Sequence, residues 1–231
     1  MGNIIFVTGT DTGAGKTVLT AMLLVFLRSG GGNALGMKPF CSGSRGDARL
    51  LHVLQGKCLT LEEVNPFYFD KPLAPAAAGP APPLAAVLKK IRLLARRCDA
   101  LVVEGAGGLL APLGRNYTAR DIISRLKCKT MVVCVNKLGV INHVLLTAES
   151  LQHAGIKEFT IVMMSAARPG LSACGNPCII RQKLPGIPIL CVPNLGRGAS
   201  KAKKVEENAK YLKKTLAQVL GHDNLITFFR K

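Results

Sequence analysis

Acidic and aromatic residues are scarce in this chain of 231 residues. It contains 13 aspartates and glutamates against 31 lysines and arginines, no tryptophan and only 5% aromatic residues, which gives a formal net charge of +18. A field this positive attracts anions, including nucleotides and nucleic acids. Because neither a known DNA-binding motif nor interleaved aromatic residues accompany the charge, we expect a solvated basic surface, and nucleic acid is not expected as a partner.

The basic excess lies mainly in the second half of the chain. Residues 1–115 contain 13 basic and 7 acidic residues (+6), whereas residues 116–231 contain 18 and 6 (+12). Residues 197–214 alone contribute seven lysines and arginines against two glutamates.

Long apolar runs and closely paired cysteines are also lacking. No run approaches the ~20 residues of a membrane span, and no basic region with a cleavage site opens the chain, so we expect a cytoplasmic protein without a membrane partner. The eight cysteines include no Cys-x-x-Cys pair. We therefore predict reduced thiols that fill apolar space, and we expect no zinc site.

Short β-branched apolar runs alternate with helical patterns along the chain. Strands are predicted at residues 4–7, 34–37, 100–103, 131–135, 159–164 and 187–192. Helices are predicted at residues 18–27, 84–97, 118–126, 142–154 and 206–220. This order predicts one α/β domain over residues 1–231, with a mostly parallel sheet between two layers of helices and ligands beyond the carboxyl ends of its strands.

A glycine-rich turn follows the first predicted strand. Residues 9–17 read Gly-Thr-Asp-Thr-Gly-Ala-Gly-Lys-Thr and lead into an apolar helix. In such a loop the backbone N–H groups cradle phosphates, Lys16 reaches the β- and γ-phosphates, and Thr17 holds Mg²⁺. Five residues separate Gly9 from Gly15, one more than in the usual pattern. The strand–turn–helix context nevertheless favours phosphate binding over an ordinary turn, and the predicted fold is therefore a P-loop NTPase-like three-layer sandwich.

Polar residues also follow the next two predicted strands. The segment Lys38-Pro39-Phe40-Cys41-Ser42-Gly43 would aim Lys38 and Ser42 into a crevice, with a surface lysine before a turn as an equal alternative. Glu104 ends a buried strand just before Gly105-Ala106-Gly107-Gly108, a position that suits Mg²⁺ coordination. Asp47, taken alone, is better explained as a helix N-cap than as a metal ligand.

A further glycine-containing segment precedes the helix predicted at residues 142–154. Residues 136–143 read Asn-Lys-Leu-Gly-Val-Ile-Asn-His. The N–H groups of residues 139–142 could bind an anion at the start of a helix. On this segment alone, capping of the helix by Asn142 is the better interpretation.

Taken together, these segments resemble the dethiobiotin synthetase family. That family shows Gly-Thr-Asp-Thr-x-x-Gly-Lys-Thr, Lys-Pro-x-x-Ser-Gly, Glu-Gly-Ala-Gly-Gly and Lys-Leu-Gly-x-Ile-Asn-His in this order, and the chain has all four. Its Asn65-Pro66-Phe67-Tyr68-Phe69 also resembles the family's Asn-Pro-Tyr segment. The resemblance runs from residue 3 to about residue 165, and the C-terminal third matches poorly.

The resemblance implies an ATP-dependent cyclo-ligase of biotin biosynthesis. In that reaction 7,8-diaminononanoate takes up CO₂ as a carbamate, and the carbamate oxygen attacks the γ-phosphate of ATP. The second amine of the resulting carbamic-phosphoric anhydride then closes a cyclic urea and expels phosphate. Attack of one anion on another requires charge neutralisation, which preorganised cations supply.

The resemblance also implies roles for the residues that match the family motifs. The catalytic residues would be Lys16, Lys38, Thr12 and Ser42. The ATP site would comprise Thr10, Asp11, Thr12, Gly13, Ala14, Gly15, Lys16, Thr17, Asp47 and Glu104. Mg²⁺ would be held by Thr17, Asp47 and Glu104. The diaminononanoate site would comprise Ser42, Gly107, Gly139, Val140, Ile141 and Asn142, with the helix start at residues 139–142 offered by the facing subunit of a homodimer.

The base pocket departs from the family pattern. Ser165 stands where the family's adenine-reading asparagine is expected after the fifth strand. A serine hydroxyl lacks the bidentate amide pattern suited to adenine, so looser use of other triphosphates is an open alternative. Pro193 and Asn194 are the candidates for the rest of this pocket.

Two other functions remain open on the sequence. A partitioning-type P-loop ATPase switch would bind DNA or protein through its basic surface. That class normally carries a lysine four residues before Gly15, where this chain has Asp11, which argues against it. An amidotransferase-coupled synthetase of cobalamin-type pathways would need a glutaminase domain, for which the 231 residues leave no room.

Overall fold

A six-stranded parallel sheet forms the centre of the fold. The computed structural model describes residues 3–168 and 170–221. The strand order is β10-β9-β8-β1-β5-β2, and every neighbouring pair is parallel. The strand bounds are Asn3–Gly9 (β1), Ala34–Met37 (β2), Ala100–Glu104 (β5), Lys129–Asn136 (β8), Phe159–Ser165 (β9) and Ile189–Val192 (β10). The inner strands are buried almost throughout, as their runs of β-branched and other apolar residues predict.

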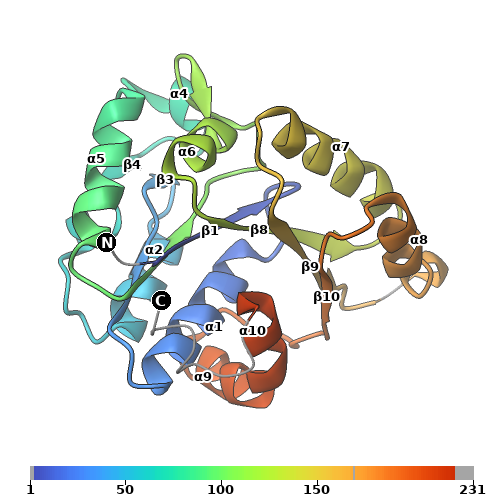
Figure 1. The fold of residues 1–231 in the computed structure, drawn as a ribbon. Helices are drawn as coiled ribbons and strands as arrows, with labels where there is room; N and C mark the ends of the chain where they lie inside the picture. Colours follow the sequence, from blue (N-terminus) through green and yellow to red (C-terminus); the bar gives the residue numbers. More distant parts are fainter. Residues whose placement is uncertain (1–2, 169, 222–231) are drawn as a thin grey trace.

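Helices cover both faces of this sheet, as Figure 1 shows. One face carries α1 (Lys16–Ser29), α9 (Ala202–Tyr211) and α10 (Lys213–Leu220). The opposite face carries α5 (Leu84–Ala95), α6 (Ala119–Leu126) and α7 (Val140–His153). Beside these layers, α2 (Gly46–Leu54) packs against α1, and α8 (Asn176–Lys183) packs against α7. The predicted three-layer arrangement is confirmed.

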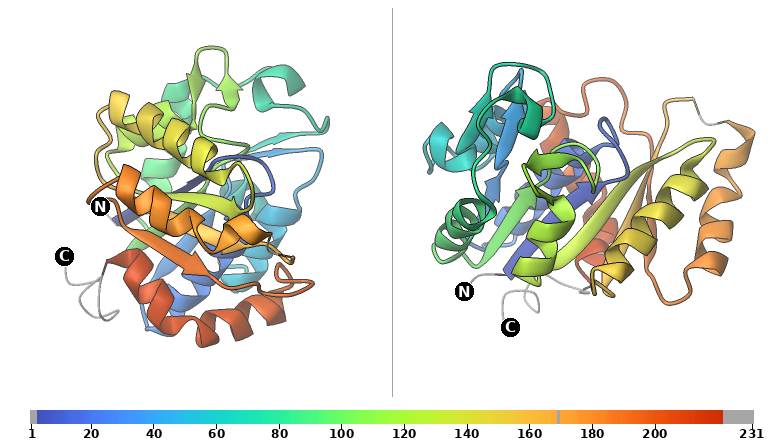
Figure 2. Two further views of the ribbon diagram at one scale, coloured as in Figure 1. Left: turned by 90° about the vertical axis from the view of Figure 1, so that its right-hand side faces the viewer. Right: turned by 90° about the horizontal axis from the view of Figure 1, so that it is seen from above.

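The strand register brings three chain segments to one edge of the sheet. Val7 of β1 lies opposite Glu104 of β5, and Met37 of β2 lies opposite Val103. The turn after β1, the residue after β2 and the last residue of β5 therefore emerge side by side. Figure 2 shows this edge from two further directions.

Short elements surround the same edge. Two strands, β3 (Phe40–Ser42) and β4 (Phe67–Phe69), form a small parallel pair, and β6 (Pro112–Gly114) and β7 (Tyr117–Thr118) form a hairpin. The remaining short helices are α3 (Leu61–Val64), α4 (Pro75–Ala78) and the 3₁₀ turn η1 (Leu171–Ala173). The proline-rich residues 71–83, read from the sequence as an extended excursion, thus contain one helical turn.

One predicted helix is broken in the structure, and several short helices, α2 and α8 among them, were not predicted. The helix predicted at residues 206–220 is two helices, α9 and α10, which meet at Leu212, a buried residue that anchors the break in the core. The sequence analysis missed α2, because this nine-residue helix buries only Ala48 and Leu51 on its inner side and offers little periodic signal.

The prediction for the cysteines is correct for only part of the set. All eight thiols are free, but the apolar-filling description holds only for Cys41, Cys98 and Cys134, which are buried, and partly for Cys128. The exposed thiols are Cys58, Cys174, Cys178 and Cys191. Within the described residues, no three His, Cys, Asp or Glu side chains gather as metal ligands, and no helix has the length and hydropathy to cross a membrane.

Thiol labelling at pH 8 tests this division. Burial raises the pKa of Cys41 and Cys98 to about 11 and that of Cys128 and Cys134 to about 12. Since the thiolate is the nucleophile, each should react about a hundredfold or more slowly than an ordinary thiol. We expect mass spectrometry of the folded protein to find the four exposed cysteines alkylated first; early labelling of Cys134 would contradict this assignment.

Candidate functional site

The turn between β1 and α1 is shaped by two glycines with left-handed backbone conformations. The φ angle is 73° at Gly13 and 99° at Gly15. A Cβ atom on Gly15 would lie 3.0 Å from the Cγ atom of Met164, so a side chain there meets both backbone strain and a steric contact. Lys16 follows as the first residue of α1, is buried, and donates from Nζ to the carbonyl oxygen of Asp11 at 2.7 Å. Burial lowers its pKa to about 8.

Lys38 lies at the centre of an ion cluster in which Lys38 and Glu104 are buried and Asp47 is half-exposed. It directly follows β2, and its Nζ lies 2.5 Å from Oε1 of Glu104 and 3.1 Å from Oδ2 of Asp47. The same ammonium group donates to the carbonyl oxygen of Gly105 at 3.1 Å. The hydroxyl of Thr17 donates to Oε1 of Glu104 at 2.7 Å. The structure therefore brings together four residues that the sequence analysis singled out separately.

The charges of this cluster depend on one another. Burial alone would lower the pKa of Lys38, but the carboxylates of Glu104 and Asp47 outweigh it, and the pKa is raised above its ordinary value. Burial raises the pKa of Glu104, and the Lys38 ammonium opposes that effect. Lys38 is consequently protonated at neutral pH, with a carboxyl group on either side.

This cluster opens into a cavity of about 670 Å³ at the edge where β1, β2 and β5 end. Among the residues predicted from the sequence, its lining includes Thr12, Gly13, Gly15, Lys16, Thr17, Lys38, Ser42, Asp47, Glu104 and Gly107. A second cavity of about 390 Å³ shares Thr12, Gly107 and Ala111 with it, and also contains Thr10 and Asp11. We call the larger space the Lys38 cavity.

The oxygen atoms of the Lys38 cavity suit a hard cation. Two carboxylates and one hydroxyl converge there, and Oε2 of Glu104 is buried without a hydrogen-bond partner. Ser42 Oγ is likewise buried and unpartnered. Buried polar atoms in native proteins are nearly always paired, so both atoms are candidates for contact with a ligand.

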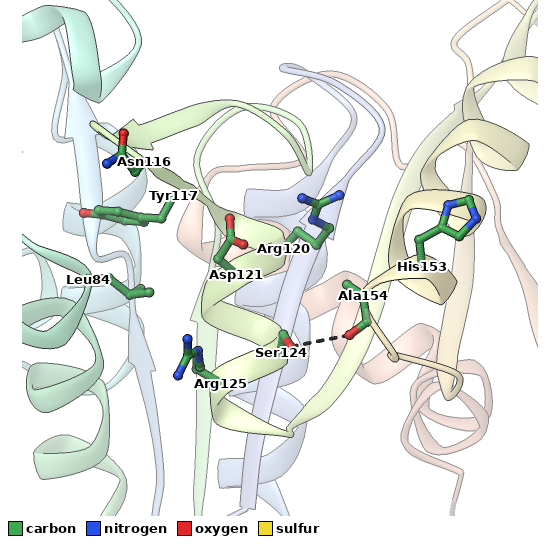
Figure 3. Close-up of a pocket in the computed structure, with 9 residues that line it drawn as sticks. All are labelled: Leu84, Asn116, Tyr117, Arg120, Asp121, Ser124, Arg125, His153 and Ala154. Carbon is green, nitrogen blue, oxygen red and sulfur yellow. Dashed lines mark hydrogen bonds between the residues drawn. The ribbon is translucent and has the colours of Figure 1, made fainter.

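A separate polar cavity of about 450 Å³ lies between the starts of α5 and β7, helix α6 and the end of α7 (Figure 3). Its polar groups make local bonds. Ser124 donates to the carbonyl oxygen of Ala154, and Asp121 accepts from the backbone N–H and the hydroxyl of Thr118. The side chains of Arg125 and His153 point apart in Figure 3. This cavity therefore lacks the converging groups of the Lys38 cavity.

Known proteins match the chain over most of its length. The family model described as an AAA domain matches residues 3–200. The ATP-dependent dethiobiotin synthetase BioD of Bacillus licheniformis is 38% identical over 197 residues, which cover 81% of this chain and 83% of the relative. The chain belongs to the dethiobiotin synthetase family. A relative of the same name from Anaeromyxobacter dehalogenans is 43% identical over 167 residues, covering 69% of this chain and 75% of its own.

Solved structures share the fold at low sequence identity. The MinD cell division protein of Aquifex aeolicus has a TM-score of 0.62 and 13% identity, covering 96% of this chain and 99% of its own. The septum site-determining protein MinD complexed with Mg-ADP from Pyrococcus horikoshii has a TM-score of 0.60 and 17% identity, covering 99% of both chains. These likenesses concern the fold alone and agree with the predicted P-loop NTPase-like class.

Some of the residues that the family resemblance assigns to the active site lie away from the Lys38 cavity. Ala14 and Val140 line a small cavity of about 70 Å³ on the other side of the turn after β1, together with Lys137 and His143. Residues 139–142 do not line the Lys38 cavity of the same chain. The base-pocket candidates Ser165, Pro193 and Asn194 also lie outside it, and the Asn194 side chain accepts from the backbone N–H of Gly196.

Two interpretations of helix caps are wrong. The residue that caps α7 is Gly139, at a φ of 86°, and Asn142 lies inside the helix with no capping bond. Asp47 is the second residue of α2, whose N-cap is Arg45, and its carboxylate contacts Lys38. At residues 139–142 the sequence identified a helix start but assigned the cap to the wrong residue, whereas at Asp47 the helix α2 itself was not predicted.

The Lys38 cavity contains residues that sequence reasoning did not assign to it. One wall is the apolar run Pro72–Pro75, and the others include Phe40, Cys41, Ser44 and Ser200. The proline cluster was visible as an unusual segment, whereas nothing near Ser200 signals a contact with the motifs, which lie about 90 to 190 residues earlier in the chain. Only the path of the chain between β10 and α9 brings Ser200 there.

A double-mutant cycle measures the buried ion pair. Lys38→Met leaves the Glu104 carboxylate buried without its main partner, and should lower the free energy of unfolding by about 3 kcal/mol. Adding Glu104→Gln removes the stranded charge, so the double variant should lose less than the sum of the single losses. Urea unfolding of the four proteins gives the coupling energy, and strictly additive losses would contradict the pairing.

Proposed function

We propose that this protein is an ATP-dependent dethiobiotin synthetase, which converts 7,8-diaminononanoate, CO₂ and ATP to dethiobiotin in the cytoplasm. The observation that carries the proposal is the position of Lys38, a buried cation at the Lys38 cavity, within bonding distance of Glu104 and Asp47. The membership of the dethiobiotin synthetase family, with relatives of that name at up to 43% identity, supports it.

The triphosphate of ATP belongs at the turn after β1. Gly13 and Gly15 leave room for close approach of phosphate oxygens, and α1 presents its positive end there. Because the pKa of Lys16 is near 8 in the free protein, an adjacent phosphate would drive it fully to the charged form. Lys16 can then move from the carbonyl of Asp11 to the β- and γ-phosphates.

The oxygen donors of Thr17, Asp47 and Glu104 fit Mg²⁺. Such ions are usually held by one or two carboxylates plus substrate phosphates, and the unpartnered Oε2 of Glu104 is a buried oxygen suited to this task. When bound, the ion supplies positive charge to the phosphate oxygens.

Lys38 supplies the positive charge that holds the second reactant, the carbamate. Its raised pKa keeps it protonated, so it can hold the carbamate oxygens against the γ-phosphate without acting as a base. Ser42, whose hydroxyl is buried and unpartnered, and Thr12 line the same cavity, and in this proposal their hydroxyls would donate to the same group. The apolar wall at Pro72–Pro75 limits the access of water to the carbamic-phosphoric anhydride.

We also propose a homodimer with shared active sites. Residues 139–142 lie outside the Lys38 cavity of their own chain, which fits a role in holding the substrate carboxylate for a facing subunit. Leu110, Leu138 and Leu146 are exposed on this side, by 53%, 86% and 57%. Exposed leucines of this kind are typical of an interface.

We propose that the protein also accepts nucleoside triphosphates with bases other than adenine. Ser165 ends β9 opposite Asn136 of β8 and offers one hydroxyl where an amide would offer both a donor and an acceptor. The carboxamide of Asn136 is engaged by Ala173 and Asn176, and the carboxamide of Asn194 bonds Gly196, so neither amide replaces it.

Phosphate release tests the proposed reaction. We expect purified protein with MgATP to release phosphate only when both diaminononanoate and bicarbonate are present, because the carbamate is the nucleophile. Release that needs no diamine and rises with added DNA would support the switch ATPase instead, and would sink the ligase proposal.

The Lys38→Met variant tests whether Lys38 is the cation that holds the carbamate. Triphosphate binding should stay within about threefold of the parent protein, because Lys16 and the turn after β1 remain, while diamine-dependent phosphate release should fall about a hundredfold or more. Calorimetry and the phosphate assay measure the two quantities, below the variant's unfolding temperature. Lys89→Met on α5 is the matched control, and a fully active Lys38→Met protein would remove Lys38 from the mechanism.

A further inference from the structure

Five lysines stand at the N-terminal ends of the two closing helices. Lys201 is the N-cap residue of α9, and Lys203 and Lys204 lie in its first turn. Lys213 and Lys214 open α10. Neither first turn contains an acidic residue. Because the N-terminus is the positive end of a helix, cations placed there destabilise it, and the chain repeats this unfavourable choice in two successive helices.

These charges are not neutralised locally. Within residues 3–168 and 170–221, the only ion pair on α9 and α10 joins Lys204 to Glu207 at 3.1 Å. The other lysines of these helices, Lys201, Lys203, Lys210, Lys213 and Lys214, are exposed. Positions that break a local stability rule without a compensating contact in the fold are expected at functional surfaces.

One exposed aromatic side chain lies between two of these lysines in the sequence. Tyr211, between Lys210 and Lys213, is 79% exposed. It is the only aromatic residue of the basic segment at residues 197–214. The aliphatic side chains of α9 and α10 that face inward, such as Val205 and Leu216, are fully buried, so the two helices present no apolar stripe that could enter a membrane.

We propose that the exposed lysines of α9 and α10, together with Tyr211, form a surface that binds single-stranded nucleic acid. The ammonium groups contact backbone phosphates and release condensed counterions, while the Tyr211 ring stacks on a base. The surface covers the α1 face of the sheet, on the side opposite to α5 and α6 (Figure 1). This binding is independent of the proposed ligase reaction.

The test uses a charge reversal with a matched control. The surface variant carries Lys203→Glu, Lys213→Glu and Lys214→Glu. The control carries Lys89→Glu, Lys90→Glu and Arg96→Glu at exposed positions of α5 and its C-cap, on the opposite face, with the same change of net charge. Fluorescence anisotropy of a labelled oligothymidylate of about 20 nucleotides, over a range of salt concentrations, measures affinity and its salt dependence.

We expect the surface variant to bind the oligothymidylate about tenfold or more weakly, with a shallower salt dependence, and the α5 control to change by less than about threefold. Tyr211→Ala should lose about tenfold in affinity with an unchanged salt slope. The surface variant should also melt at a higher temperature than the parent, because glutamates suit helix N-termini, which shows that lost binding does not come from unfolding.

Other outcomes overturn the proposal. Equal losses in the surface variant and the α5 control would assign the binding to net charge alone. Binding to anionic phospholipid vesicles but not to the oligonucleotide would assign the surface to a membrane. If duplex DNA binds as tightly as the single strand and Tyr211→Ala does not change the affinity, the Tyr211 ring does not stack on a base. Phosphate release with diaminononanoate should be unaffected by the oligonucleotide, and a change in that rate would contradict the independence of this binding from the proposed ligase reaction.

Discussion

The ion cluster of Lys38, Glu104 and Asp47 is the interaction on which the rest of the site depends. A buried ammonium group is costly to desolvate, and here two carboxylates and a backbone carbonyl compensate that cost. The same carboxylates are the candidate metal ligands, and Thr17 joins them through Glu104. One arrangement therefore holds two strands and two helix starts together, and places the protonated Lys38 beside the glycine-rich turn after β1.

The parallel register of the strands brings the residues of this cluster together. The chain segments that carry Thr17, Lys38 and Glu104 follow or end β1, β2 and β5, which are neighbours in the sheet although they are far apart in the sequence. The distantly similar MinD proteins share this sheet at 13–17% identity. The fold thus supplies the edge, and the residues after each strand determine the chemistry.

Much of the fold and the centre of the site could be predicted from the sequence. The six central strands follow from short β-branched runs, and the strand-end rule placed Lys16, Lys38 and Glu104 together. The predictions failed where the position of a residue depends on contacts with residues that are distant in the sequence. Asp47 was interpreted as a helix cap because its contact with Lys38 cannot be inferred from the residues around it. Ser200 reaches the Lys38 cavity only because of the path that the chain takes. The break at Leu212 and the exposure of four cysteines likewise depend on tertiary packing.

The central claim is that a carbamate oxygen attacks the γ-phosphate within the Lys38 cavity. Oxygen-18-labelled bicarbonate tests it directly, in unlabelled water, with diaminononanoate and MgATP, over a time shorter than the exchange of label with water. The account predicts that each released phosphate carries one oxygen-18 atom, because the bridging oxygen of the anhydride leaves with phosphorus when the ring closes. Phosphate without label, measured by mass spectrometry in parallel with product formation, would show attack by water and contradict the account.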